Sequence, residues 1–175
     1  LIPSRPFRSR QIETKMIYPF DDVMSEDKNN EIYNFLLNET QYSYGERDRP
    51  HHTPVGMVVE LDGTDLGNYL RDVAISKFDK LDGLELQRSY VNLFLPNDRP
   101  YFHQDGDVFT CLFYITPQYD IGEGGETQFI VNNIIQGLPP RPARLVVFDG
   151  EMWHRATSYR SHPRLTAAVK FEKKK

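Results

Sequence analysis

The sequence predicts a mainly β protein with flanking α-helices, folded as a single domain over residues 1–175. Two stretches of helical periodicity lie in the first half of the chain, and short β-like runs separated by turn residues follow from residue 86 onward. The length of 175 residues is that of one ordinary domain. Many short strands indicate an all-β sandwich or barrel. Because the helices come first, we expect them to brace the outside of one sheet.

Two helices are predicted. Ser25 can cap a helix over about residues 26–38, with Ile32, Phe35 and Leu36 on one face. A second helix, over about residues 65–81, can be capped by Thr64 or Asp62. Its apolar residues follow the i, i+3, i+4, i+7 spacing of a helix packed on one side: Leu66, Tyr69, Leu70 and Val73.

The strand-like runs are short and are bounded by turn residues such as Pro96-Asn97-Asp98 and Asp149-Gly150. They cover residues 55–61, 86–95, 108–116, 126–131, 143–148, 153–158 and 164–171. Two loops, 41–54 and 117–125, are each either a substrate lid or a passive surface connection.

Composition excludes several classes of protein. The chain has 21 Lys and Arg against 25 Asp and Glu, and its net charge of −4 argues against a surface that grips nucleic acid throughout. A single cysteine, Cys111, excludes an internal disulfide framework and a cysteine zinc cluster. No apolar run approaches the ~20 residues of a membrane helix, and no signal peptide is visible. We therefore expect no membrane contact and a cytoplasmic protein, in a chain that does not begin with Met.

Candidate metal ligands begin with His103-Gln104-Asp105. Because side chains alternate along a strand, His103 and Asp105 can point to the same side and reach one ion. A later histidine on a facing strand could complete the 2-His-1-carboxylate set associated with non-heme Fe(II), and His154 is the best candidate.

Arg164 opens the last strand-like run. Thr166 and Ala168 share its face, which leaves room beside a guanidinium suited to bind a carboxylate. Arg155 and Arg160 are rivals, but neither opens a strand with small neighbours.

Two more segments surround these residues. Residues 124–129 read Gly-Gly-Glu-Thr-Gln-Phe, and residues 144–150 read Arg-Leu-Val-Val-Phe-Asp-Gly shortly before His154. Together with His103-x-Asp105 and Arg164, they resemble the Fe(II)/2-oxoglutarate-dependent oxygenases, and within them the prolyl 4-hydroxylase-like subgroup. The resemblance is good over residues 86–171 and loose over residues 1–85.

The resemblance implies a double-stranded β-helix (jelly-roll) core over residues 86–171, with residues 1–85 as a helical N-terminal support. It implies Fe(II) held by His103, Asp105 and His154, with 2-oxoglutarate and O2 as cosubstrates and ascorbate as a candidate reductant. Arg164 would pair with the distal carboxylate of 2-oxoglutarate.

Two further cosubstrate contacts are implied. Tyr114 matches a tyrosine that donates to the distal carboxylate in oxygen-sensing prolyl hydroxylases, and Asn92 matches an asparagine that contacts 2-oxoglutarate in alkylated-nucleic-acid demethylases. Those demethylases carry a tyrosine where this chain has Phe94, so that hydroxyl contact is absent. Collagen-type prolyl 4-hydroxylases carry lysine where this chain has Arg164.

The function that the resemblance implies is hydroxylation of a C–H bond, foremost in a peptidyl proline, with release of succinate and CO2. Thr127 and Trp153 are candidate substrate contacts. One alternative is hydroxylation of a free amino acid or small metabolite. Another is demethylation of a nucleic-acid base, which Asn92 and the basic chain ends favour and the net charge of −4 disfavours. The last is a jelly-roll binding module that has lost its chemistry.

Other marked residues are expected to be structural. His51 and His52 are neighbours on a polar loop, where adjacent residues rarely chelate together, and we expect them to be exposed. His162 precedes Pro163 and is expected on a loop surface, and Cys111 is expected to be a buried strand residue.

Overall fold

The computed structural model describes residues 17–45, 53–106 and 108–174. The strands of this part of the chain are β1 (Ile17–Phe20), β2 (Ser43–Tyr44), β3 (Met57–Glu60), β4 (Glu85–Phe94), β5 (Phe109–Tyr114), β6 (Thr127–Val131), β7 (Ile134–Leu138), β8 (Leu145–Asp149), β9 (His154–Ala156) and β10 (Arg164–Glu172). Its helical elements are the α-helices α1 (Glu26–Asn38) and α2 (Asp65–Lys77) and the 3-10 turns η1 (Asp79–Leu81) and η2 (Ile121–Glu123).

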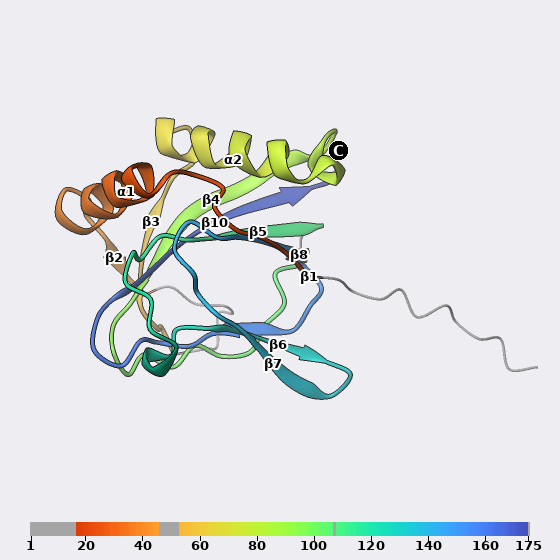
Figure 1. Ribbon diagram of the computed structural model, residues 1–175. Helices are drawn as coiled ribbons and strands as arrows, with labels where there is room; N and C mark the ends of the chain where they lie inside the picture. Colours follow the sequence, from red (N-terminus) through yellow and green to blue (C-terminus); the bar gives the residue numbers. More distant parts are fainter. Residues whose placement is uncertain (1–16, 46–52, 107, 175) are drawn as a thin grey trace, which may run out of the picture.

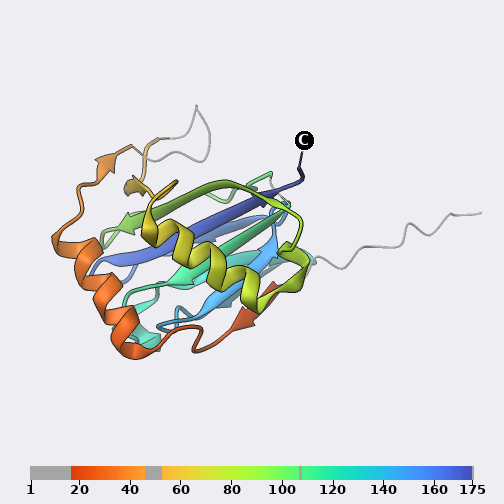
Figure 2. The same ribbon diagram turned by 90° about the horizontal axis from the view of Figure 1, so that it is seen from above.

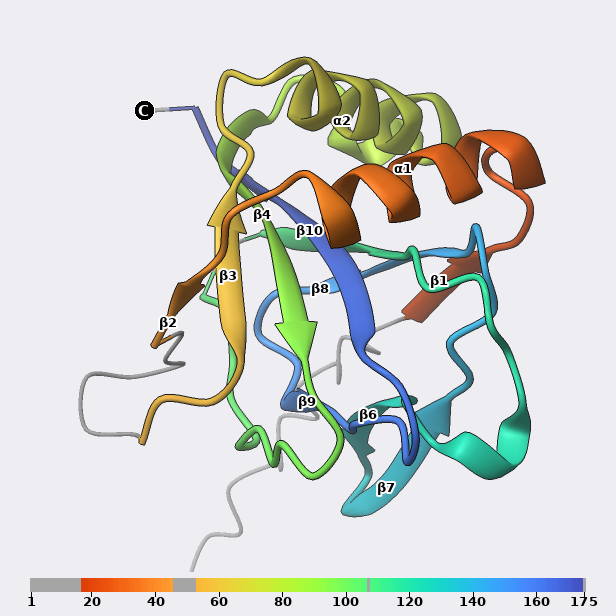
Figure 3. The same ribbon diagram turned by 90° about the vertical axis from the view of Figure 1, so that its left-hand side faces the viewer.

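Within the described residues, the strands form two antiparallel sheets. The larger sheet has seven strands in the order β1-β8-β5-β10-β4-β3-β2, and the smaller has three in the order β7-β6-β9. Figure 1 shows the two sheets as layers, with α1 and α2 on the outer face of the larger one. The view from above shows the helices lying across the strands of the larger sheet (Figure 2). The side view shows the smaller sheet on the opposite side of the larger sheet from the helices (Figure 3). This is a jelly roll, so the predicted fold class is confirmed.

Local side-chain chemistry starts both helices where the sequence predicts. The Ser25 side chain accepts a hydrogen bond from the Lys28 N–H, and Thr64 accepts one from the Gly67 N–H. Asp62, the other predicted cap, does not cap the helix. Its carboxylate accepts hydrogen bonds from the backbone N–H and the hydroxyl of Ser89, which connects the segment before α2 to β4.

The second helix ends at Lys77. The sequence analysis predicts an end near residue 81, and this boundary is wrong. Phe78 leaves the helical conformation, with φ −138° and ψ 99°, and its ring packs 4.8 Å from Tyr18 and 5.3 Å from Phe109 between ring centroids. The packing of Phe78 against aromatic residues of β1 and β5 therefore ends the helix earlier than its apolar periodicity predicts. In the first helix, Ile32 and Leu36 are buried as predicted, but Phe35 is 45% exposed.

Every predicted strand run contains a strand, but β1, β2 and β7 were missed. β7 follows β6 through Asn132 and Asn133, which adopt φ of 51° and 62°. Two consecutive residues of positive φ make the tight turn of a hairpin, and asparagine tolerates them better than most residues. The Asn-Asn pair was the available signal, but exposed β7 lacks the alternation that marks a half-buried strand.

Alternation along β10 separates the core from the space between the sheets. Leu165, Ala167 and Val169 are fully buried on the face that packs under the helices, beside Leu36 and Leu70. The alternate residues, from Arg164 onward, face the smaller sheet. A second apolar cluster lies between the sheets and is formed by Tyr114, Phe129, Val146, Phe148 and Met152.

Leu70 provides a test of the helix-to-sheet core. It is fully buried on α2, so Leu70→Ala should lower the free energy of unfolding by about 2–5 kcal/mol in urea titrations followed by circular dichroism. Ile75→Ala on the same helix, where the side chain is 36% exposed, is the matched control and should cost under about 1 kcal/mol. Equal losses would mean that α2 does not pack through the Leu70 face.

Candidate active site

The segment before β5 and the start of β9 are joined by backbone hydrogen bonds. His103 N–H donates to the His154 carbonyl and His154 N–H to the His103 carbonyl, both at 3.0 Å. Two residues on, Asp105 N–H donates to the Gly150 carbonyl at 2.9 Å. This short antiparallel bridge brings the His-x-Asp segment against a histidine about fifty residues away.

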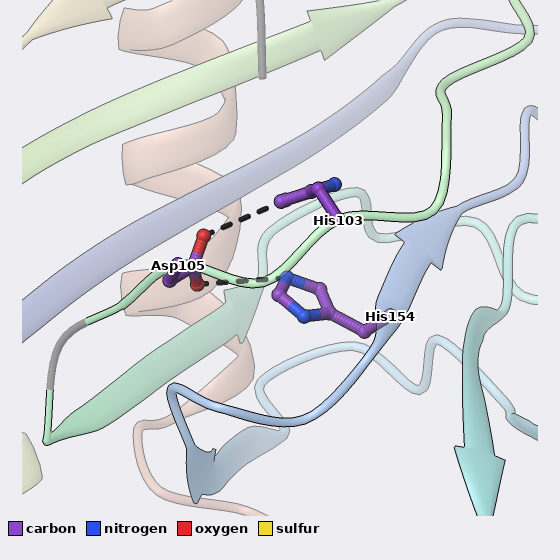
Figure 4. A group of neighbouring side chains, drawn as sticks. All are labelled: His103, Asp105 and His154. Atoms are coloured by element: carbon purple, nitrogen blue, oxygen red, sulfur yellow. Dashed lines mark ion pairs between the residues drawn. The ribbon is translucent and has the colours of Figure 1, made fainter. Parts of the chain in front are cut away.

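The three side chains meet as a compact cluster (Figure 4). One possible ligand atom from each of His103, Asp105 and His154 lies within 4.8 Å of the others. His103 Nε2 is 3.5 Å from Asp105 Oδ1, and His154 Nε2 is 3.5 Å from Asp105 Oδ2.

Backbone carbonyls fix the orientation of both imidazoles. His103 Nδ1 lies 3.0 Å from the Tyr101 carbonyl, and His154 Nδ1 lies 2.9 Å from the Met152 carbonyl. A carbonyl oxygen only accepts, so each Nδ1 carries the proton and each Nε2 keeps its lone pair toward the carboxylate. Metal-ligating histidines commonly use such a hydrogen bond to set their tautomer.

The electrostatics favour the protonation states that bind metal. Burial lowers the pKa of His154 to about 4, so its ring is neutral near pH 7. Burial raises the pKa of Asp105, but at the low pH where this carboxylate would gain a proton the imidazoles of His103 and His154 are protonated, and together with the Lys170 ammonium they hold the pKa below its ordinary value. A neutral imidazole and an ionised carboxylate are ready to coordinate without losing a proton.

Two residues that the sequence analysis did not single out hold Asp105. Thr110 Oγ1 donates to Oδ2 at 2.5 Å, and Lys170 Nζ donates to Oδ1 at 2.8 Å. The alternation that groups Arg164, Thr166 and Ala168 on one face continues to Lys170, so this residue could have been found from the same pattern.

Arg164 is 1% exposed and is bonded only to uncharged groups among the described residues. Its Nε donates to the Gly125 carbonyl at 2.7 Å, its Nη1 to Thr166 Oγ1 at 3.2 Å and its Nη2 to Thr127 Oγ1 at 3.0 Å. Burial lowers its pKa. Burying a guanidinium without a bonded carboxylate is costly, so this group is suited to bind an anion from outside the chain.

Thr127 links the guanidinium to Tyr114. The Tyr114 hydroxyl donates to Thr127 Oγ1 at 2.7 Å, and the same oxygen accepts from Arg164. With both bonds accepted, the Thr127 hydroxyl keeps its own proton to donate. Tyr114 is buried behind Thr127, and Thr127 is the member of the pair that lines the cavity.

One cavity contains the whole constellation. His103, Asp105, His154 and Arg164 line a space of about 670 Å³, counting its open mouth, between the two sheets. Asn92 lines the same cavity, and its buried Oδ1 has no hydrogen-bond partner within the described part of the chain.

The other candidates lie elsewhere. Trp153 is 41% exposed and outside the cavity lining, and His51 and His52 fall outside the described residues. His162 stacks on Tyr159 with ring centroids 4.3 Å apart. Arg155 lies over the Phe102 ring, Arg160 is exposed, and Cys111 is fully buried.

Solved structures share this architecture. A prolyl-4-hydroxylase of Pseudomonas putida superposes with a TM-score of 0.71 at 16% identity, covering 93% of this chain and 95% of that one. A Trichoplax adhaerens prolyl hydroxylase, solved with a hypoxia inducible factor peptide fragment, gives 0.73 at 15% identity, with 89% and 83% covered. HygX of Streptomyces hygroscopicus, solved with nickel, 2-oxoglutarate and hygromycin B, gives 0.70 at 10% identity, with 91% and 84% covered.

This chain has the fold of the 2-oxoglutarate/Fe(II) oxygenases. No protein-family model matches the sequence, and no curated protein matches it either. None of the described helices combines the length and the apolar character needed to cross a bilayer.

Gly125 tests how the Arg164 pocket is built. It adopts φ +79°, and a Cβ there would lie 2.4 Å from a Tyr159 ring carbon, so Gly125→Ala should lower the free energy of unfolding by roughly 2–4 kcal/mol. Gly122→Ala is the control, because its new Cβ would meet only Asp120 Oδ1 at 3.3 Å. Thermal or urea unfolding compares the two, and a tolerated Gly125→Ala would contradict this packing.

Proposed function

We propose that this protein is an Fe(II)- and 2-oxoglutarate-dependent dioxygenase that hydroxylates a C–H bond. The observation that carries the proposal is the buried guanidinium of Arg164, which has no acidic partner among the described residues and shares one cavity with His103, Asp105 and His154. The cavity thus holds three metal ligands and a cation that can bind a carboxylate. This pairing suits 2-oxoglutarate, which has a metal-chelating keto acid at one end and a carboxylate at the other. The shared fold supports the same function.

The donor set fits a divalent first-row metal. Two neutral imidazoles and one carboxylate form the facial set of non-heme iron oxygenases, which leaves coordination positions open for ligands. O2 would be the oxidant: one oxygen atom would enter succinate as 2-oxoglutarate loses CO2, and the other would enter the substrate hydroxyl, with Fe(II) as the site that activates O2. The protein contributes the fixed His103 and His154 rings, the ionised Asp105 and a largely enclosed cavity.

The cavity walls assign a role to each polar group. Arg164 would bind the distal carboxylate of 2-oxoglutarate, with Thr127 and Thr166 completing the hydrogen bonds. Tyr114 would position Thr127 rather than touch the carboxylate. Asn92, on the neighbouring strand β4, would orient the keto acid end.

We propose a peptidyl proline as the substrate. Two of the structures described above are prolyl hydroxylases, and the Gly-Gly-Glu-Thr-Gln-Phe segment points the same way. The remaining cavity lining is mainly apolar, which suits a pyrrolidine ring. Its apolar members include Val55, Phe94, Pro100, Leu112 and Ala156.

Hydroxylation of a small molecule is the second candidate, favoured by the likeness to HygX, a structure that holds hygromycin B. A nucleic-acid base is the weaker alternative, because Phe94 offers no hydroxyl to the cosubstrate and the net charge is −4. A mass gain of one oxygen on a proline peptide or a metabolite, or loss of a methyl group from a methylated base, would separate these substrates, with ascorbate included to keep iron reduced. We further propose that residues 1–85 support a catalytic core at 86–171 within one cytoplasmic domain.

The first test is anaerobic addition of Fe(II) and 2-oxoglutarate to metal-free protein, followed by visible spectroscopy. We expect a new charge-transfer band that is absent in His103→Ala, because that variant lacks one metal ligand. Circular dichroism confirms that the variant is folded. If folded wild-type protein gives no band, the binding-module alternative replaces the oxygenase.

Arg164 is tested by its effect on the cosubstrate. Arg164→Leu should raise the 2-oxoglutarate concentration needed for half-maximal succinate formation by at least about tenfold, since a charge-assisted bidentate pair is lost. Arg160→Leu, which removes an exposed arginine, should leave it unchanged. An unaltered requirement in Arg164→Leu would mean that the distal carboxylate binds elsewhere.

A further inference from the structure

Asp105 has a partner that the proposed chemistry does not require. The ammonium of Lys170 lies 2.8 Å from Asp105 Oδ1, and the two side chains are only 12% and 4% exposed. Desolvating such a pair is costly, and removing one member leaves an uncompensated buried charge. Lys170 therefore strongly affects the energy of the Asp105 carboxylate, which the proposed metal would use as a ligand.

The larger sheet holds Lys170 in place from both neighbouring strands. On β10, Lys170 stands opposite Thr110 of β5 and Arg88 of β4. Its Nζ lies 5.4 Å from the centroid of the Tyr90 ring, and the Arg88 guanidinium carbon lies 4.1 Å from the same centroid. The ammonium is thus directed at Asp105 by a packed environment.

Each oxygen of Asp105 contacts one group from the sheet and one imidazole. Oδ1 meets Lys170 and His103, and Oδ2 meets Thr110 and His154. A metal ion bound between the imidazoles and this carboxylate would share Asp105 with the ammonium. Two cations would then lie on one carboxylate, in a site with little water to screen them.

We propose that Lys170 acts as a built-in counter-ion for Asp105, which keeps the carboxylate in place in the metal-free protein and weakens metal binding by competing for it. The inference rests on the metal site of the proposed function. In the metal-free protein, Lys170 faces one negative charge and attracts it. Once a divalent ion is bound, Lys170 faces a carboxylate-metal unit of net positive charge, so its contribution changes sign.

The test uses Mn(II) alone, titrated by calorimetry into protein stripped with a chelator. Lys170→Met removes the charge at similar length, and Lys170→Gln removes the charge but keeps a hydrogen-bond donor. Both should bind Mn(II) at least about tenfold more tightly than wild type. Lys170→Arg keeps the charge and should bind like wild type. Lys173→Met, an exposed lysine beyond the end of β10, is the matched control.

Stability without metal gives a second readout, independent of turnover. The melting temperature of stripped Lys170→Met should fall by roughly 10 °C, because Asp105 is left buried and uncompensated, and Mn(II) should restore most of the loss. If this variant does not fold without metal, Lys170→Gln provides the affinity comparison. Unchanged or weaker Mn(II) binding in the neutral variants would overturn the role of Lys170. Absence of Mn(II) binding in the wild type would refute the metal site itself.

Discussion

The alternation of side chains along β10 is the constraint on which the rest of the structure depends. Strand β10 pairs with β5 and β4, at the centre of the seven-stranded sheet. One set of its residues, including Leu165 and Val169, completes the core under the helices. The other set runs from Arg164 to Lys170 and places an arginine at one end of the inner face and a lysine at the other. A register slip of one residue would bury both charges in the apolar core.

A few backbone hydrogen bonds assemble the three-residue cluster. The bridge between His103 and His154 and the bond from Asp105 to Gly150 join two chain segments that are far apart in sequence. The same segments supply the carbonyls of Tyr101 and Met152 that fix the ring tautomers. The positions and the protonation of the ligands thus come from one local piece of antiparallel structure.

Periodicity and caps predicted most of the fold. Ser25 and Thr64 start the helices as expected, and the alternation on β10 gave the correct division of its faces. The end of the second helix was mispredicted, because Phe78 packs against residues from two other strands, a tertiary contact that helical periodicity does not encode. Strand β7 was missed, because its residues are mostly exposed and offer no alternating pattern.

For the site, the motifs and the family resemblance selected six residues that line one cavity, namely Asn92, His103, Asp105, Thr127, His154 and Arg164. They also selected Tyr114 and Trp153, which do not line it. What spacing could not provide is the order of contacts: Tyr114 reaches the cavity only through Thr127, and Lys170 contacts Asp105. These depend on how deep each side chain sits and on which neighbour it meets across the strand. Both are properties of the packed sheet rather than of the linear sequence.

The two faces of β10 also affect how such a protein can change over generations. Substitutions among the helix-facing residues are limited by packing volume, whereas those at Thr166 or Ala168 alter the wall of the cavity. Because the two groups alternate, a new cavity shape can arise without disturbing the packing beneath the helices. Within the nine residues of β10, the positions that determine stability are therefore different from those that shape the cavity, so the two properties can change independently.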